Sequence, residues 1–328
     1  MAAADSKKVV IAALAGNVAI AVCKLTAAML SHSTATLAEA AHSVADSGNQ
    51  VLLLVGMGLA MKPPDDAFPF GRSAERYFWP FVVALMLFSL GGTFAIVEGT
   101  HNIMAGPSPE ELAAKYVHLA GFRFPSVWIS YAVLGLSFLF EAMSFRVAYR
   151  EFQHLAKGKP ILKAIFDARD PTVPLVLAED STALVGLAIA LAAVILSNVT
   201  GNAWWDPLGS IVIGVLLSVV AVVLAWVTHG LLIGKSVVEE DRVKIAEIAR
   251  KTPNVDAVTQ LLAMHQGPDV VIVALKIAFR TDMSVAEIEA TTNAMEKELR
   301  EAMPDLRKIF IEADSKGDGR GLHVLGKA

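Results

Sequence analysis

The sequence predicts an α-helical membrane protein with six transmembrane helices, followed by a small cytosolic α+β domain. Three observations predict this fold class. Hydrophobic residues make up 55% of the 328 residues and charged residues 18%, against roughly 25% charged residues in soluble proteins. Six long apolar runs occupy the first 234 residues. Half of the charged residues lie in the last 94, so a polar domain follows an apolar body.

The six apolar runs define the expected transmembrane domain, residues 1–234. A bilayer core takes about 20 mostly apolar residues per helix, and each run reaches that length. The runs are Val9–Leu30, Leu37–Met61, Tyr77–Ile103, Ser126–Tyr149, Pro174–Leu196 and Pro207–Ile233. Proline marks two boundaries, since Lys62-Pro63-Pro64 ends the second run and Asp206-Pro207 opens the sixth.

The connections between the runs predict the orientation of the chain. Eleven Lys and Arg residues lie before the first run, between the second and third, and between the fourth and fifth, when Arg146 near the end of the fourth run is counted with the last group. The other connections carry only Lys115 and Arg123. By the positive-inside rule, both termini are cytoplasmic. The run lengths suit a bacterial inner membrane or an organelle, and we expect a multi-pass protein of the bacterial inner membrane.

The polar region predicts a second domain, residues 235–315, with the element order α-β-β-α-β. Its expected elements are helix Glu239–Lys251, strands Val255–His265 and Val270–Phe279, helix Ser284–Ala302 and strand Leu306–Glu312. Ser284 and Glu287, three residues apart, form a capping-box pattern. This order is typical of a ferredoxin-like, open-faced sandwich. The glycine-rich residues 316–328 are expected to form a flexible tail.

The second run contains ionisable side chains that hydrocarbon disfavours. His42 and Asp46 are four positions apart, so both side chains lie on one face of a helix. One imidazole and one carboxylate supply half of a tetrahedral site for Zn²⁺ or a similar ion. The alternative is that these two residues only hydrogen-bond each other, or lie near a hydrated helix end.

The fifth run adds two acids, Glu179 and Asp180, with no basic residue nearby in the sequence. Their charge needs either a cation or protons, because placing an uncompensated charge inside a membrane helix is unfavourable in free energy. If the second and fifth runs pack side by side, four groups meet: His42, Asp46, Glu179 and Asp180. The sequence therefore predicts a metal site within the membrane.

Two other acids lie in apolar runs. Glu98 is near the end of the third run, where an interfacial position is expected. Glu141 is deeper, and it either serves a proton path or pairs with Arg146 or another polar neighbour. Four glycines are expected at close helix contacts: Gly56, Gly58, Gly91 and Gly92.

The composition also argues against several classes of protein. The net charge of −4 provides no basic excess for binding nucleic acid. The single cysteine, Cys23, excludes an intrachain disulfide framework and a multi-cysteine zinc site. The sequence contains no evident nucleophile–base pair or cofactor loop, so an enzyme is not expected.

Four segments resemble the cation diffusion facilitators, solute carrier family 30. They are Ala15-Gly16-Asn17, the His42/Asp46 segment continuing as Asp46-Ser47-Gly48-Asn49-Gln50, Phe70-Gly71-Arg72-Ser73-Ala74-Glu75-Arg76, and Glu179-Asp180. The resemblance covers nearly the whole chain, including six runs followed by an α-β-β-α-β domain. Asn49-Gln50 and Glu179-Asp180 are similar to the branch that contains the mitochondrial zinc transporter.

This resemblance implies a homodimeric antiporter that exchanges Zn²⁺ for protons across the lipid bilayer by alternating access. Carried over residue by residue, the implied ligands are His42, Asp46 and Asp180. Family members place His or Asp four residues before the last of these, where this chain has Val176. Water or a backbone group then competes for the fourth position with Glu179. Glu179 reaches the fourth ligand position only if the helix rotates or unwinds, because adjacent helical residues point about 100° apart.

The donor set leaves the identity of the metal open. One imidazole with carboxylates suits Zn²⁺ and also accepts Mn²⁺, Co²⁺ or Fe²⁺. Protons compete with the metal for the same lone pairs, so a proton gradient can drive export from the cytosol. The rival interpretation is a membrane-anchored metal sensor or scaffold that does not transport.

Two further metal sites of the family are incomplete in this chain. Many members carry a second site after the second run, and here Phe68 and Arg72 occupy its histidine positions, although Asp65 is present. In the C-terminal domain, only Glu312 and Asp314 match the ligands that some members use.

Overall fold

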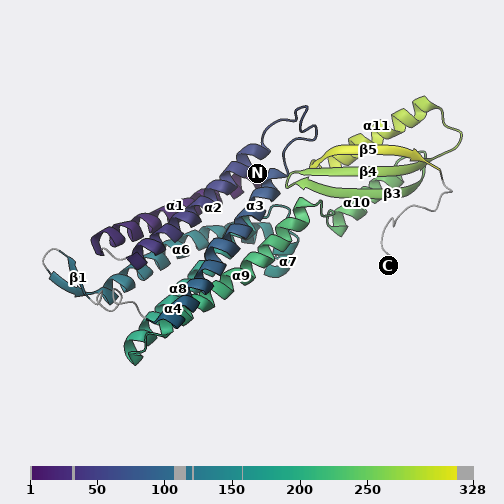
Figure 1. Ribbon diagram of the computed structural model, residues 1–328. Helices are drawn as coiled ribbons and strands as arrows, with labels where there is room; N and C mark the ends of the chain where they lie inside the picture. The colour runs from purple at the N-terminus through teal and green to yellow at the C-terminus, as the bar shows by residue number, and fades with distance from the viewer. Residues whose placement is uncertain (1, 32–33, 107–115, 120–121, 157, 316–328) are drawn as a thin grey trace. The chain divides into compact units, whose positions relative to one another are not determined.

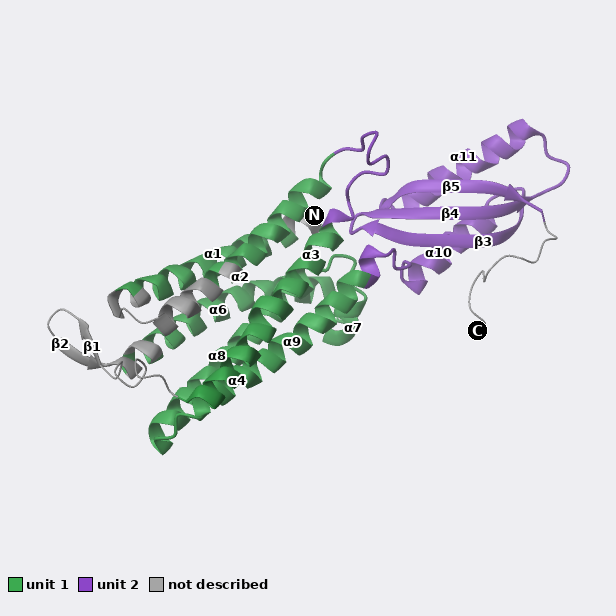
Figure 2. Ribbon diagram, in the orientation of Figure 1, with its two compact units in different colours: residues 1–62, 76–229 green, residues 63–75, 230–328 purple. Residues whose placement is uncertain are grey.

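The structure is a computed structural model that describes residues 2–31, 34–106, 116–119, 122–156 and 158–315 (Figure 1). It contains two compact units (Figure 2). The helical unit comprises residues 1–62 and 76–229, and the α+β unit comprises residues 63–75 and 230–328. The expected flexible tail, residues 316–328, lies outside the described residues. The division of the chain at residue 234 stays a prediction about independently folding domains.

Long helices build the helical unit. They are α1 (Ala2–Ser31), α2 (Thr34–Ala60), α3 (Glu75–Met86), α4 (Phe94–Ala105), α6 (Ser126–Ala156), α8 (Thr172–Thr200) and α9 (Trp205–Leu232), with the short α7 (Ile161–Phe166) before α8. α1 packs along α2 and α6, and α6 packs along α8. An antiparallel pair, β1 (Tyr116–Leu119) and β2 (Phe122–Pro125), precedes α6. Apolar side chains of these helices form the core, among them Val10, Leu53, Val83, Phe152 and Val176.

Five helical segments of the described residues are long and apolar enough to cross a bilayer. They are Ser6–Thr26, Glu75–Ala105, Tyr131–Ala156, Thr172–Thr200 and Trp205–Leu232. These segments correspond to five of the six expected runs. The remaining run forms the continuous helix α2, which is not among them. Its role as a sixth span stays a prediction.

The third run is helical throughout but changes its winding. Residues Leu87–Thr93 form the π-helical segment η1 between α3 and α4, which the apolar pattern did not predict because a π-turn leaves composition unchanged. A Cβ on Gly92 would collide with Ser218 Oγ of α9, which confirms the close contact expected there. A Cβ on Gly56 would also be too close to the Trp79 indole ring of α3, at 2.6 Å from Cδ1. A Cβ on Gly58, by contrast, would meet no described atom within 4 Å.

Gly99 of α4 lies against the backbone of α9. A Cβ on Gly99 would lie 2.7 Å from the Pro207 carbonyl oxygen and 2.8 Å from Ile211 Cγ1. We expect Gly99→Ala to destabilise the full chain by about 1–3 kcal/mol, because the two helices would have to separate. Thermal unfolding in detergent, followed by circular dichroism, measures the change.

Gly135→Ala is the matched control for this contact. An added Cβ on Gly135 of α6 meets no described atom within 4 Å. Because alanine favours the helix over glycine, this variant should unfold at the wild-type temperature or above it. Equal losses in the two variants would contradict the close approach of α4 and α9.

The α+β unit has the predicted element order. Its elements are α10 (Glu239–Lys251), β3 (Val255–Gly267), β4 (Val270–Phe279), α11 (Val285–Ala302) and β5 (Leu306–Asp314). The sheet order is β3-β4-β5, with β3–β4 antiparallel and β4–β5 parallel. A parallel pair needs a crossover connection, which α11 provides. The ferredoxin-like assignment stays a prediction.

One face of this sheet forms the core of the α+β unit. Val271, Val273, Leu275 and Ile277 of β4 are buried. Since strand side chains alternate between two faces, these four residues point to the same side. They join apolar residues of α10 and α11 in one cluster, so both helices pack on that face.

The segment 63–75, which connects α2 to α3, folds with the α+β unit. Phe70 packs edge-on against Phe310 of β5, with 6.3 Å between the ring centroids. Ser73 Oγ donates a hydrogen bond to the Gln266 carbonyl oxygen at 3.4 Å. Gln266 Nε2 donates to the Phe70 carbonyl oxygen at 3.2 Å. These contacts fix the connection to β3 and β5.

The capping box predicted for α11 is confirmed. Ser284 Oγ accepts a hydrogen bond from the Glu287 N–H at 3.4 Å, and the Glu287 carboxylate accepts from the Ser284 N–H at 2.7 Å. Hydrogen bonds from the backbone and side chain of Ser284 lower the pKa of Glu287. The first turn of α11 is therefore stabilised by an ionised carboxylate.

We expect Ser284→Ala to weaken the first turn of α11 by about 1 kcal/mol. Hydrogen–deuterium exchange of the full chain measures this as lower protection of the first-turn amides. Because the folded-state pKa of Glu287 is lowered, its contribution is present above the unfolded-state pKa and is lost as pH falls through the folded-state pKa. Wild-type protection should therefore decrease on acidification more than that of Ser284→Ala. The same decrease in both proteins would contradict the cap.

Candidate metal centre

Two adjacent carboxylates of α8 lie inside the helical unit. Glu179 is 8% exposed and Asp180 is 2% exposed. Adjacent helical residues point about 100° apart, so the two carboxylates meet different neighbours. Glu179 meets side chains of α2, and Asp180 meets a side chain of α6.

Two amides of α2 bind Glu179. Asn49 Nδ2 donates to one carboxylate oxygen at 2.8 Å, and Gln50 Nε2 donates to the other at 2.9 Å. The fully buried Gln50 accepts, through Oε1, a hydrogen bond from Asn17 Nδ2 of α1 at 3.1 Å. A chain of hydrogen bonds therefore joins α1, α2 and α8. It brings the second and fifth runs together, as the predicted metal site requires.

A hydroxyl of α6 binds Asp180. Ser144 Oγ donates to Asp180 Oδ2 at 2.7 Å. Glu141, about one turn before Ser144, is buried, and Asp180, Asp46 of α2 and Lys24 of α1 lie within electrostatic range of it. Carboxylates from three helices thus gather in one part of the unit. Arg146, the alternative partner for Glu141, is exposed.

The structure describes the predicted ligands only in part. It places Asp46, Glu179 and Asp180, with Asp46 half-buried. His42 belongs to α2, but its side chain lies outside the described residues. Within the described part of the chain, no three metal-binding side chains lie close enough together to hold an ion. Coordination by His42, Asp46, Asp180 and Glu179 therefore stays a prediction.

Two details bear on the fourth ligand. Val176, one turn before Asp180, is fully buried in the apolar core and offers no donor atom. Both oxygens of Glu179 accept hydrogen bonds from amides. Each carboxylate oxygen retains a further lone pair, so Glu179 can bind an ion alongside an amide or in place of one.

The hydrogen-bond donors to these two carboxylates are neutral. Amides bind Glu179, a hydroxyl binds Asp180, and no described residue forms an ion pair with either. Neutral donors orient a carboxylate without cancelling its charge. The centre can therefore hold a cation or protons, as intramembrane acids of ion pathways do.

The polar partners of Glu179 and Asp180 could not be predicted from the local sequence pattern alone. Asn17, Asn49 and Gln50 stood out only because they resemble family segments, and Ser144 had no predicted role. A usable signal is the spacing of small polar residues in an apolar helix. Ser137 and Ser144 flank Glu141 at helical spacing on one buried face of α6.

The remnants of the two incomplete family sites have protein partners. Arg72 Nη2 pairs with Asp65 Oδ2 at 3.0 Å. Glu312 pairs with a lysine of β4 at 3.3 Å. Thr259 Oγ1 donates to Asp314 Oδ2 at 2.6 Å, and this hydrogen bond lowers the pKa of Asp314. Loss of the two metal sites stays a prediction.

The long apolar helices and the small α+β domain define a multi-pass membrane protein, and the buried acids of α8 are unusual for such a helix. Two family models match this chain: the cation efflux transmembrane domain over residues 10–233 and the cation efflux protein cytoplasmic domain over residues 237–316. The chain belongs to the cation efflux family, the cation diffusion facilitators. The resemblance seen in the sequence is thereby confirmed.

Several known proteins are similar to this chain. Metal tolerance protein C4 of Arabidopsis thaliana is 33% identical over 290 residues, which cover 88% of this chain and 58% of that protein. The mitochondrial proton-coupled zinc antiporter SLC30A9 of Mus musculus is 28% identical over 293 residues, 89% of this chain and 48% of that protein. The manganese efflux system protein MneP of Bacillus subtilis is 25% identical over 128 residues, 39% of this chain and 43% of that protein. The chain spans about half the length of the first two relatives.

The hydrogen bonds of Gln50 generate a stability prediction. We expect Gln50→Leu to destabilise the full chain by about 1–3 kcal/mol, because buried Glu179 loses a donor and Asn17 loses an acceptor. In a Glu179→Gln background the same substitution should cost less, since no charged acceptor is left unpaired. Unfolding of the four proteins in detergent completes the double-mutant cycle. Additive effects of the two substitutions would contradict the contact.

Proposed function

We propose that this protein exports a divalent metal ion from the cytosol in exchange for protons, by alternating access. Zn²⁺ is the first candidate substrate, followed by Mn²⁺, Co²⁺ and Fe²⁺. His42, Asp46 and Asp180 bind the metal, and Glu179 is a further donor. The names of two relatives, a proton-coupled zinc antiporter and a manganese efflux protein, support a transition-metal substrate.

The observation that carries this proposal is the pair of buried acids in α8 whose described donors are all neutral. Removing an ionised carboxylate from water costs several kcal/mol unless a positive charge compensates it. A metal ion moving outwards and protons returning inwards supply that charge in alternation. A sensor that only uses the membrane as an anchor has no need of acids within its helices.

The exchange follows from competition for the same lone pairs. A metal binds carboxylates and imidazole only in their deprotonated forms, and an imidazole ordinarily titrates at about pH 6.5. On the neutral cytosolic side, the deprotonated centre binds the metal. On a more acidic side, protons displace it, so the proton gradient drives export.

The positive-inside distribution supports cytoplasmic termini and six spans that include α2, in a setting such as the bacterial inner membrane. The α+β domain then lies in the cytosol. Its match to the dimer-forming cytoplasmic domain of cation efflux proteins supports a homodimer. Transport, rather than catalysis, is the activity assigned to the chain.

Proton flux into proteoliposomes tests this function. His42→Ala, Asp46→Ala and Asp180→Asn should each abolish the flux that Zn²⁺ drives, because each removes one donor from a small ligand set. An enclosed pH dye reports the flux. Parallel additions of Zn²⁺, Mn²⁺, Co²⁺ and Fe²⁺ establish the preferred metal.

Glu98→Gln is the matched control, because it neutralises an exposed acid of α4 that has no part in the centre. Its flux should equal that of the wild type. Wild-type flux in all three ligand variants refutes the proposed site. A folded wild-type protein that binds metal but moves no protons refutes antiport and supports the sensor or scaffold instead.

A further inference from the structure

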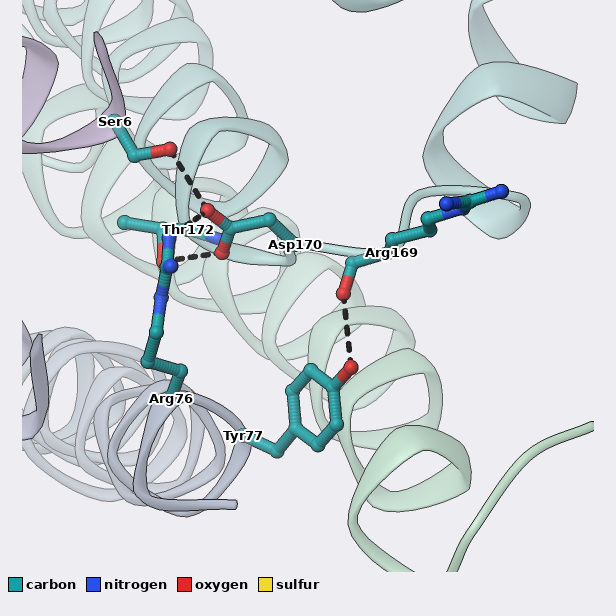
Figure 3. Close-up of polar contacts among 6 residues, drawn as sticks. All are labelled: Ser6, Arg76, Tyr77, Arg169, Asp170 and Thr172. Carbon is teal, nitrogen blue, oxygen red and sulfur yellow. Dashed lines mark hydrogen bonds and ion pairs between the residues drawn. The ribbon is translucent and has the colours of Figure 1, made fainter. Parts of the chain in front are cut away.

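A second buried charge cluster lies where α1, α3 and α8 begin (Figure 3). Its centre is an ion pair between Arg76, at the start of α3, and Asp170, two residues before α8. The two side chains are only 7% and 9% exposed. The proposed exchange of metal and protons uses neither residue.

Asp170 joins three helices through its two carboxylate oxygens. Oδ2 pairs with the Arg76 guanidinium and accepts a hydrogen bond from Ser6 Oγ of α1 at 2.7 Å. Oδ1 accepts from Thr172 at the start of α8, at 2.7 Å from its Oγ1 and 3.1 Å from its N–H. Figure 3 shows these groups converging on the carboxylate. Ser6, Arg76, Asp170 and Thr172 are called the α8 lock below.

A neighbouring contact fixes the same segment. Tyr77, fully buried next to Arg76 in the sequence, donates from its hydroxyl to the Arg169 carbonyl oxygen at 3.1 Å. Two consecutive residues of α3 therefore bind two consecutive residues of the chain that enters α8. The start of α8 cannot move away from α3 without breaking both contacts.

A buried ion pair between helices has a large desolvation free energy. Apolar residues of similar volume often stabilise a protein as well or better, because desolvating two charges costs several kcal/mol per ion. An ion pair responds to water differently from an apolar contact. The attraction between its two charges becomes weaker as the local dielectric constant rises. An ion pair therefore suits a contact that alternates between a dry state and a hydrated one.

The lock and the candidate metal centre lie on the same helix. Asp180 follows Thr172 by eight positions in α8, a distance of about 12 Å at 1.5 Å per residue. A gap between the starts of α1, α3 and α8 would give water and ions a route towards Asp180. The hydrogen bonds and ion pair of the α8 lock join all three helices, so their starts cannot separate while these contacts are formed.

We propose that the Arg76–Asp170 ion pair is a gate at this end of the helical unit. While the pair is formed, the end is closed to water and ions, and when it separates, the cation reaches the carboxylates of α8. This inference rests on the proposed function. In the proposed orientation, the gated end is the cytoplasmic one.

Thiol labelling tests the gate without requiring transport. The single cysteine is removed by Cys23→Ser, and Val176→Cys, one turn before Asp180, reports access to the centre. A membrane-impermeant maleimide is applied to sealed vesicles from either side. Arg76→Gln should raise labelling from the side of the termini about tenfold, equivalent to about 1.4 kcal/mol in the open–closed equilibrium. Labelling from the opposite side should not rise.

Two variants show whether the charge pair itself is responsible. Asp65→Asn breaks an exposed Arg–Asp pair outside the helical unit and should leave labelling unchanged. Exchange of the charges, Arg76→Asp with Asp170→Arg, should return labelling towards the wild-type rate. A rise that the exchange does not reverse overturns the assignment to this pair.

Milder variants cover the case in which Arg76→Gln does not fold. Tyr77→Phe and Ser6→Ala each delete one hydrogen bond to the same segment, and each should give a smaller one-sided rise. Wild-type labelling in all variants that fold overturns the gate. So does a rise from both sides, because general loosening of the helices has no sidedness.

The two proposals fail in different ways. Absence of metal-driven proton flux in the wild type overturns the exchange, whereas the labelling rates still report whether the pair controls access. Normal flux in the wild type together with unchanged labelling in the variants overturns only the gate.

Discussion

Two buried acids inside an otherwise apolar helix are the constraint around which the helical unit is organised. Glu179 and Asp180 lie side by side in α8, and each needs donors that water cannot supply. Amides of α2 and a hydroxyl of α6 meet this need, and an amide of α1 supports the α2 contact. Four polar residues of these helices, Asn17, Asn49, Gln50 and Ser144, therefore belong to one network around α8.

The unit compensates its buried acids in two different ways. Near the start of α8, the Arg76 guanidinium cancels the charge of Asp170 within the protein itself. Further along the same helix, the described donors to Glu179 and Asp180 are neutral, and they orient the two carboxyl groups without supplying a positive charge. A permanent counter-ion suits a contact between helices, whereas an exchangeable one suits a site that a cation enters and leaves. This contrast separates the gate from the candidate metal centre on physical grounds.

The α+β unit is stabilised by an ordinary apolar core. Alternating burial along β4 and the capped helix α11 give it a core independent of any intramembrane charge. The segment 63–75 packs on its sheet through Phe70 and Ser73 and ends at Glu75. The next residue is Arg76, so the chain runs without a spacer from a part of the α+β unit into the α8 lock.

The sequence by itself determined the helices, the α-β-β-α-β order and the anomalous acids, because these features depend on local composition and periodicity. Helix α10 and strand β4 have the predicted bounds. The two adjacent acids Glu179 and Asp180 are recognisable in the sequence because the run around them is apolar. Only the tertiary structure decided which donors meet those acids, that segment 63–75 joins the sheet, and that Arg76 binds Asp170. Such partners depend on the rotation and depth of each helix against its neighbours. Packing of the whole unit sets those quantities, and no short stretch of sequence encodes them.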